Sequence, residues 1–360
     1  MEDYLKLTKK LISVPSVSSN QEQVKKCAQI IIDYLGNDFI VQKVCYNGFT
    51  SLVISREKKK KHDVFLYGHL DVVPATQNQF IPNTKNDRLY GRGSLDMKSA
   101  VAVQADILKK DKTDLSLALV LVPDEEIGGE NGLKQVLAKG FTADLAIVPD
   151  AGFGKSIVVN EKGVSFYKVK AFGKGGHGSR PWTASNPVLK LYDFYFKLIK
   201  ELKIKNSQND FGLSVNLGRI ISGERANQIP ELAEMDLDFR FSSEKDRQRL
   251  KEFFNKKEKE SDFVIKNPLN AEVFNMDSKN NYLGKFKKTA EAVLGSELVF
   301  SKQFGASDAR FFSAKGIPVI NYQPVGDGNH QKGEYVDLNS LKKFHLILSN
   351  FLDLLNKNKK

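Results

Sequence analysis

Short apolar runs recur through the first half of the chain, and three of them end in a polar cluster, namely G-H-L-D, P-D-E-E and P-D. Apolar runs of this length, separated by segments of helical periodicity, predict an α/β sheet with helices on its faces. We expect strands at 51–55, 64–67, 117–122 and 145–148, and helices at 3–12 and 20–35. Sites in α/β folds gather at the carboxyl ends of strands, so the polar clusters mark a functional edge.

The order of expected elements changes in the middle of the chain. Between residues 165 and 274 it reads strand, helix, strand, strand, helix, strand, which is the order of a ferredoxin-like unit. A helix at 282–294 and a strand at 319–322 then resume the alternation of strands and helices found in the first part of the chain. A chain of 360 residues also exceeds the size, roughly 250–300 residues, at which one core stops growing. We therefore predict one domain from residues 1–164 and 275–360, with an α+β domain at 165–274 inserted into it.

The net charge of +12 raises the alternative of a nucleic-acid-binding protein. The lysines are spread widely, however, and runs such as Lys58–Lys61 fall between expected strands, as in solvated loops. We predict no nucleic-acid partner, although a basic surface can steer an acidic substrate. The N-terminus lacks the apolar run of a signal peptide, and no stretch approaches the ~20 apolar residues of a membrane span. The sequence thus predicts a cytoplasmic protein without a membrane partner.

One of the five histidines directly follows an expected strand. His69 lies in G-H-L-D-V-V-P, and Asp71 stands two residues on, pointing to the same side of the chain. A metal-bound histidine usually donates its second ring N–H to a carboxylate, and the carboxylate of Asp71 is placed to accept such a hydrogen bond from His69. A purely structural histidine explains this motif equally well.

Several further polar residues occupy comparable places. Asp96 lies in G-R-G-S-L-D-M-K before an expected helix, where an isolated Asp is more often an N-cap. Glu125 and Glu126 are adjacent acids that repel each other unless a cation is near, so one can bind metal while the other handles protons. Asp150 ends a strand in V-P-D-A-G, and His330 lies in G-D-G-N-H.

Each of these residues, taken alone, is explained by an ordinary structural role. Only their joint occurrence indicates a metal site. Two histidines and three carboxylates at strand ends and glycine turns form a nitrogen and oxygen ligand set that suits zinc. Two metals close together would need a bridging carboxylate and a water that they acidify for attack on a carbonyl. The candidate ligands are His69, Asp96, Glu126, Asp150 and His330.

The ordered motifs resemble those of the zinc amidohydrolases that include succinyl-diaminopimelate desuccinylase, acetylornithine deacetylase, carboxypeptidase G and cytosolic dipeptidases. Beyond the motifs above they comprise G-G-H-G-S-R-P, A-N-Q-I-P, D-F-R-F and G-A-S-D-A-R, and they cover nearly the whole chain. The resemblance implies a mixed-sheet zinc-peptidase catalytic domain whose inserted domain is a lid. It also implies two zinc ions per chain, which cobalt or manganese can replace, and a homodimer formed through the lid.

The resemblance further implies a role for each matched residue. Asp96 would bridge the metals, with His69 and Asp150 completing one site and Glu126 and His330 the other. Glu125 would be the general base and Asp71 would orient His69. His177 would donate to the oxyanion, and Arg240 would hold the substrate carboxylate. The candidate substrate-binding residues are His177, Asn227, Arg240 and Gly305.

The substrate and two other classes of protein stay open at this point. True desuccinylases usually carry Thr at the position of Ala306, Asn at that of Gly326 and a basic pair at Glu161-Lys162, so the substrate is either an N-acyl amino acid or a short peptide. A dinucleotide site at the G-x-G-x-x-G of residues 173–178 is disfavoured, because Pro181 and Trp182 stand where its helix should start. A non-catalytic relative of the same fold would be expected to have lost ligands, and all are present here.

Overall fold

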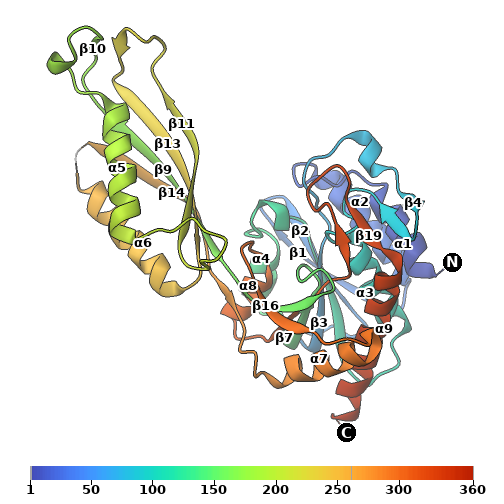
Figure 1. Cartoon of the computed structure of the whole chain (residues 1–360). Coiled ribbons are helices and arrows are strands. Elements are labelled where there is room, and N and C mark those ends of the chain that lie inside the picture. Colours follow the sequence, from blue (N-terminus) through green and yellow to red (C-terminus); the bar gives the residue numbers. More distant parts are fainter. Residues whose placement is uncertain (1, 261, 360) are drawn as a thin grey trace. The chain divides into compact units, whose positions relative to one another are not determined.

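The computed structural model of the chain describes residues 2–260 and 262–359. The chain forms two compact units, and each is described by itself. Unit 1 comprises Met1–Val159, Asn275–Gln303 and Ser307–Lys360, and unit 2 comprises Asn160–Phe274 and Phe304–Ala306. The first and last helices, α1 (Asp3–Ile12) and α9 (Leu338–Lys357), both belong to unit 1 (Figure 1).

Unit 1 is organised around a mixed sheet with the strand order β1-β2-β6-β3-β7-β17-β8-β15, and β16 pairs with β8. At its centre β3 runs parallel to both β6 and β7, whereas β1 and β2 are antiparallel. All six residues of β6 are buried, as expected for a strand covered on both faces. The strands are β1 (Ile40–Tyr46), β2 (Phe49–Ser55), β3 (Lys61–His69), β6 (Leu117–Val122), β7 (Thr142–Val148), β8 (Ser156–Glu161), β15 (Phe274–Asn275), β16 (Val299–Gln303) and β17 (Val319–Asn321).

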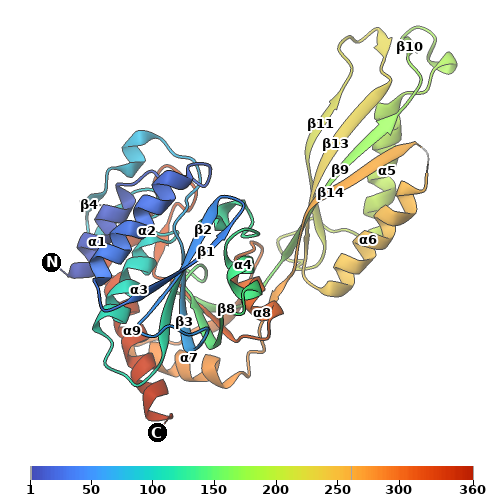
Figure 2. The same cartoon turned by 180° about the vertical axis from the view of Figure 1, so that it is seen from behind.

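The helices of unit 1 form two groups. α3 (Lys98–Lys110) packs against β3 and β6 and contacts α1, α2 (Gln21–Leu35) and α9, while α9 also contacts α7 (Asn281–Leu294) (Figure 2). Residues 98–108 of α3 are all buried, because the sheet and the neighbouring helices enclose it. The second group pairs α4 (Leu133–Ala138) with α8 (Ala309–Ala314). A small sheet contains β4 (Asn83–Lys85), β5 (Arg88–Tyr90), β18 (Gly326–Asp327) and β19 (Tyr335–Asp337).

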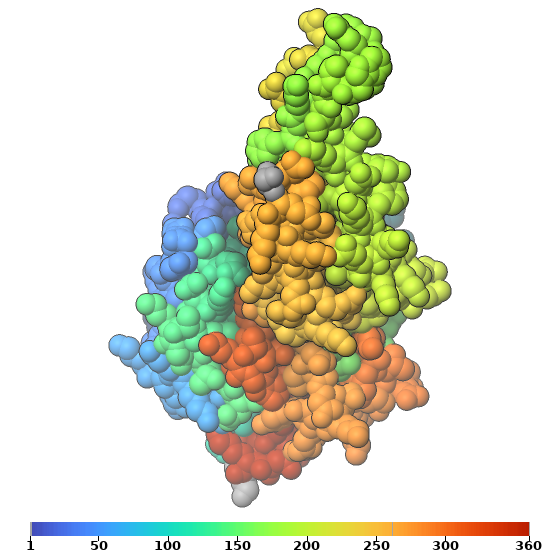
Figure 3. All heavy atoms as spheres, turned by 90° about the vertical axis from the view of Figure 1, so that its left-hand side faces the viewer, coloured from blue at the N-terminus to red at the C-terminus, as the bar shows by residue number. Residues whose placement is uncertain are grey.

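Unit 2 is an antiparallel sheet with the strand order β11-β13-β9-β14 and two helices, α5 (Pro187–Leu202) and α6 (Glu244–Glu258). Alternate residues of β13 are buried, so one face of the sheet packs onto the aromatic faces of the helices. Figure 3 shows α5 in yellow-green beside α6 in gold. The strands are β9 (Gly163–Phe172), β11 (Ser214–Ser222), β13 (Leu232–Phe241) and β14 (Phe263–Ala271), with the short pair β10 (Gly176–His177) and β12 (Gln228–Ile229).

The predicted mixed α/β fold is confirmed, and the strongest periodic segments begin and end where expected. The bounds of α1 and β6 agree with the sequence patterns. The strand β1 was not predicted, because most of its residues are exposed or half-buried and leave no apolar run. Among the described residues, every helix is too short or too polar to cross a membrane.

A buried carboxylate ties three helices of unit 1 together. Asp106 of α3 is 1% exposed and accepts hydrogen bonds from His345 of α9 at 3.0 Å and from Tyr34 of α2. Lys110 lies 2.7 Å from the same carboxylate. Burial raises the pKa of Asp106, but the hydrogen bonds from His345, Lys110 and Tyr34 outweigh burial and lower it to about 2. His345, for which the sequence offers no role, therefore has a structural one.

We expect Asp106→Asn to lower the free energy of unfolding near neutral pH by on the order of 2 kcal/mol, the energy equivalent of the lowered pKa. The pKa of Asp106 in the folded state lies below its unfolded value, so this stabilisation is present above the unfolded pKa and is lost as the pH falls through about 2. Urea unfolding of both proteins across the acidic range measures the difference. A difference that stayed constant down to the lowest pH would contradict this explanation.

Candidate metal centre

His69 is the last residue of β3 and is fully buried at the carboxyl edge of the sheet of unit 1. Its Nε2 lies 2.8 Å from Oδ1 of Asp96. Its Nδ1 lies 2.9 Å from the backbone carbonyl oxygen of Asp71 and 3.6 Å from Oδ1 of the Asp71 carboxylate. The carbonyl is thus the nearer partner, whereas the sequence predicted the carboxylate.

The Asp71 carboxylate instead holds the adjacent acids in place. It accepts hydrogen bonds from the backbone N–H of Glu125 at 3.1 Å and of Glu126 at 3.2 Å. It also accepts a hydrogen bond from Ser18 Oγ at 2.7 Å. Glu125 and Glu126 begin a 3-10 turn (Glu125–Ile127), whose first N–H groups have no partner within the turn. Asp71 therefore fixes the backbone from which both glutamates project.

Asp96 presents its two carboxylate oxygens to two different histidines. Oδ1 faces His69, and Oδ2 lies 3.1 Å from Nε2 of His330. Asp96 is joined to Met97 by a cis peptide bond, and Met97, not Asp96, is the N-cap of α3. Asp96 therefore does not have the N-cap role that its sequence position favoured.

His330 also contacts the second glutamate of the acid pair. Its Nε2 lies 3.1 Å from Oε2 of Glu126, and its side chain is 51% exposed. Hydrogen bonds to Asp96 and Glu126 raise the pKa of His330 to about 10. Burial would lower the pKa of His69, but the neighbouring Asp71 and Asp96 carboxylates raise it well above its usual range. Both imidazoles are thus drawn toward the cationic form by surrounding carboxylates.

Four of the five candidate ligands, together with Glu125, form two overlapping clusters that share His69. One ligand atom each from His69, Glu125 and Asp150 lies within 4.8 Å of the others, and the same holds for His69, Asp96 and Glu126. Burial, helped by neighbouring carboxylates, raises the pKa of Glu125 well above its usual range. So many carboxylates in one place repel one another, and a cation relieves that repulsion. The mixture of imidazole and carboxylate donors fits a divalent metal ion such as zinc.

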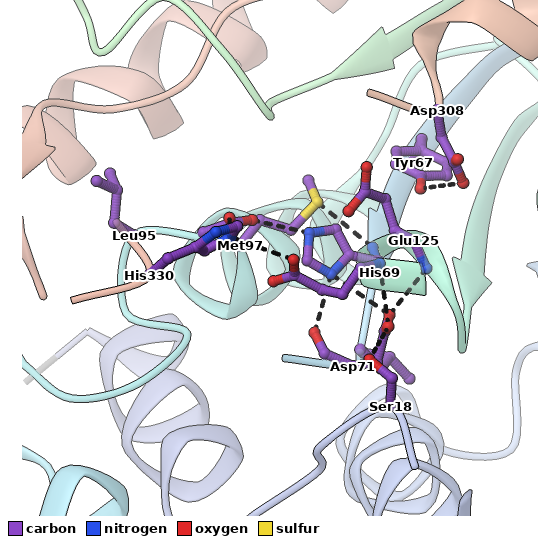
Figure 4. A network of polar contacts seen from close by, with 12 residues as sticks. Ser18, Tyr67, His69, Asp71, Leu95, Met97, Glu125, Asp308 and His330 are labelled. Carbon is purple, nitrogen blue, oxygen red and sulfur yellow. Dashed lines mark hydrogen bonds and ion pairs between the residues drawn. The ribbon is translucent and has the colours of Figure 1, made fainter. Parts of the chain in front are cut away.

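A second buried layer, which the sequence patterns left undecided or did not single out, supports the cluster. Asp308 is fully buried and accepts a hydrogen bond at 2.7 Å from Tyr67, beside Glu125 (Figure 4). Arg310 lies 3.6 Å from Asp308 and donates at 2.7 Å to the carbonyl of Gly128, at the end of the 3-10 turn. Asp308 and Arg310 therefore pair with each other behind the acid pair.

The remaining candidates belong to unit 2 and do not form one site within it. His177 in β10 pairs with Gln228, next to Asn227, whose carbonyl accepts a hydrogen bond from Gly178 at 2.8 Å. Arg240 pairs with Val164 at the start of β9, whereas β10 follows the end of β9. At 3.3 Å per strand residue, the ten residues of β9 separate the two groups by roughly 30 Å.

Two other sequence features also lie in unit 2. Gly305 has open surroundings, with no atom within 4 Å of where a Cβ would stand. The G-x-G-x-x-G segment is followed by a three-residue 3-10 turn (Pro181–Thr183), and α5 starts only at Pro187. The helix that a dinucleotide site requires does not begin at these glycines.

Comparisons with known proteins agree with this chemistry. Residues 65–353 match the model of Peptidase family M20/M25/M40. The chain is 29% identical to succinyl-diaminopimelate desuccinylase from Helicobacter pylori over 98% of both chains, and 27% identical to that of Rickettsia bellii over 81% of both. A solved M20 family metallo-carboxypeptidase from Sulfolobus solfataricus shares the fold, with a TM-score of 0.80 at 19% identity and coverage of 99% of this chain and 100% of the other.

The family match spans well over half of the chain and includes all five candidate ligands. It implies a hydrolase that acts on amide or peptide bonds with divalent metal ions, typically zinc. The mixed α/β sheet, the clustered imidazoles and carboxylates and the motif order lead to the same assignment: this chain belongs to Peptidase family M20/M25/M40.

Proposed function

We propose that this chain is a two-zinc hydrolase that cleaves the linear amide bond of a small N-acyl amino acid, as a desuccinylase or an acetylornithine deacetylase does. The observation that carries the proposal is the placement of Asp96, whose two oxygens face His69 and His330 separately at 2.8 and 3.1 Å. A carboxylate placed in this way suits a bridge between two ions. The similarity to desuccinylases along nearly the full chain supports the substrate class.

The remaining ligands divide between the two ions. His69 and Asp150 share one cluster with Glu125, and they would hold the first ion together with Asp96, which belongs to the other cluster of His69. Glu126 and His330 lie 3.1 Å apart and would complete the second. Two zinc ions bound there would acidify a water and polarise the carbonyl of the scissile amide.

Glu125 is the acid of the pair that this ligand set leaves free, and we assign it the proton transfers. It takes a proton from the attacking water while the water oxygen bonds to the amide carbon. It then delivers that proton to the amide nitrogen as the carbon–nitrogen bond breaks. Asp71 keeps Glu125 in position through its backbone N–H at 3.1 Å. In the proposal Asp71 thus acts on the base as well as on His69.

Unit 2 would supply the contacts to the substrate. His177 donates to the developing oxyanion, Arg240 holds a carboxylate, and Asn227 and Gly305 line the site. Because His177 and Arg240 lie at opposite ends of unit 2, both can contact one small substrate only if they come from two copies of the chain. The proposal therefore includes a homodimer in which unit 2 acts as lid and interface.

An exposed apolar stripe on α5 supports such an interface. Leu189, Tyr192 and Phe196 are 63%, 59% and 52% exposed. Their spacing of three and four residues places them on one face of the helix. Large exposed side chains in a row are typical of surfaces that another protein covers.

A short peptide is the alternative substrate. The chain shares its fold with a metallo-carboxypeptidase. It also has Ala306, Gly326 and the Glu161-Lys162 pair where desuccinylases usually carry other residues. The same metal centre serves either substrate, because both have an amide carbonyl next to a free carboxylate.

Metal analysis with a substrate panel tests the proposed reaction. We expect about two zinc ions per chain and chelator-sensitive hydrolysis that added zinc restores. N-succinyl and N-acetyl amino acids should be cleaved faster than dipeptides. Faster cleavage of dipeptides would favour the peptidase alternative. A protein that takes up no metal and hydrolyses none of the panel after zinc addition would contradict the proposal.

Glu125→Ala should abolish turnover while leaving zinc binding largely intact, because Glu125 moves protons and is not a ligand in the proposed scheme. Glu130→Ala is the matched control, since the carboxylate of Glu130 is near the same turn and pairs only with Lys134, at 2.5 Å, in the described structure. Single-turnover kinetics and zinc titration separate the two properties. Near-normal turnover of Glu125→Ala would remove Glu125 from the role of base.

His177→Ala should lower kcat by on the order of 10²–10³, as loss of one oxyanion donor does. If His177 acts on the partner's site, a mixture of inactive Glu125→Ala and His177→Ala chains should regain part of the activity, because some dimers then contain one intact site. Co-purification of the two variants, each carrying a different affinity tag, shows whether mixed dimers form. Mixed dimers without recovered activity would place His177 outside the partner's site.

A further inference from the structure

Arg92 and Glu334 form a buried ion pair close to the candidate metal centre, within unit 1. Arg92 is 3% exposed and Glu334 is 1% exposed. Nη1 of Arg92 lies 2.5 Å from Oε2 of Glu334, although the two residues are far apart in the sequence. The pair joins the segment that carries Asp96 to the segment that carries His330.

Each partner contacts the backbone of a candidate ligand segment. Oε1 of Glu334 accepts hydrogen bonds from the N–H of Leu95 at 3.0 Å and of Asp96 at 3.2 Å. Nη2 of Arg92 donates at 3.3 Å to the carbonyl of Gln331, the residue after His330. One ion pair thus fixes the backbone next to Asp96 and the backbone next to His330, on the two sides of their contact.

The backbone at His330 needs such support. His330 has a φ of +60°, in the left-handed region that non-glycine residues seldom occupy. Residues keep such a conformation where the surrounding structure enforces it. The carbonyl of the next residue, Gln331, is held from two sides, by Arg92 and by Nε2 of Gln79 at 3.1 Å.

Stability alone does not explain a buried ion pair at this place. Taking two charges out of water is costly, and apolar replacements of similar volume are often neutral or stabilising. Glu334 in addition places a second carboxylate against the loop of Asp96, where like charges repel. Because the ion pair costs free energy through desolvation and repulsion, its presence is better explained by the backbone geometry that it imposes on the segments of Asp96 and His330.

We propose that Arg92 and Glu334 are positioning residues that set the spacing between Asp96 and His330, and hence the zinc affinity of the centre. The inference rests on the proposed function, in which Asp96 and His330 are metal ligands. It assigns to the pair an effect on metal binding that is separate from any effect on folding.

The test measures zinc affinity of metal-free protein by competition with a chromophoric chelator, together with the free energy of unfolding. We expect Glu334→Ala to weaken zinc binding by about 10- to 100-fold, the usual effect of losing a partner that orients metal ligands. Asp106→Asn is the matched control, because it removes another buried carboxylate of unit 1 that contacts no candidate ligand in the described structure. The control should lose stability and keep its zinc affinity.

The double variant Arg92→Met/Glu334→Leu separates positioning from folding. It fills the same space without burying charge, so it should recover the stability that Glu334→Ala loses and still bind zinc weakly. It also provides the readout if Glu334→Ala does not fold. Unchanged zinc affinity in the double variant would overturn the inference, provided that Asp96→Ala and His330→Ala bind zinc weakly. If those two variants also bind zinc normally, the proposed ligand set itself is wrong.

Discussion

The repulsion among carboxylates at one buried edge of a sheet is the constraint on which the rest of unit 1 depends. His69 belongs to two groups of side chains that could hold a metal ion, one with Asp96 and Glu126 and the other with Glu125 and Asp150. The parallel arrangement of β3 with β6 and β7 creates the crowding, because it brings three strand ends to the same edge. Without a cation, the carboxylates of this group would have to bind protons or move apart, and a divalent cation would relieve their repulsion.

Much of the surrounding structure holds these like charges together. The turn that carries the two glutamates is fixed at its start by Asp71, through two N–H groups, and at its end by Arg310, through the carbonyl of Gly128. Gly129 follows with a φ of +66°, and a Cβ there would stand 2.2 Å from Oδ1 of Asp308. The turn can pass so close to this buried carboxylate only because it has no side chain at that position. These contacts therefore hold the backbone of the turn rather than the two glutamate side chains, of which Glu126 faces His330.

Unit 2 distributes its polar residues in a different way. His177 and Asn227 lie at one end of unit 2 and Arg240 at the other, so a strand length separates the groups that the proposal assigns to one small substrate. In the proposed homodimer each copy contributes a different end to each site. The exposed apolar face of α5 gives that arrangement a physical basis, since its burial would stabilise association.

The sequence alone determined the mixed α/β class and the long periodic elements, and it predicted the residue types of the candidate metal centre, because these follow from local periodicity and from polar residues placed at strand ends. It could not determine which atoms meet. The carbonyl of Asp71 rather than its carboxylate lies nearest to His69, and its carboxylate binds amides 54 and 55 residues away. The pairing of Arg92 with Glu334 spans 242 residues. Such contacts depend on strand order and loop paths, which local patterns do not encode, so only the tertiary structure decided them.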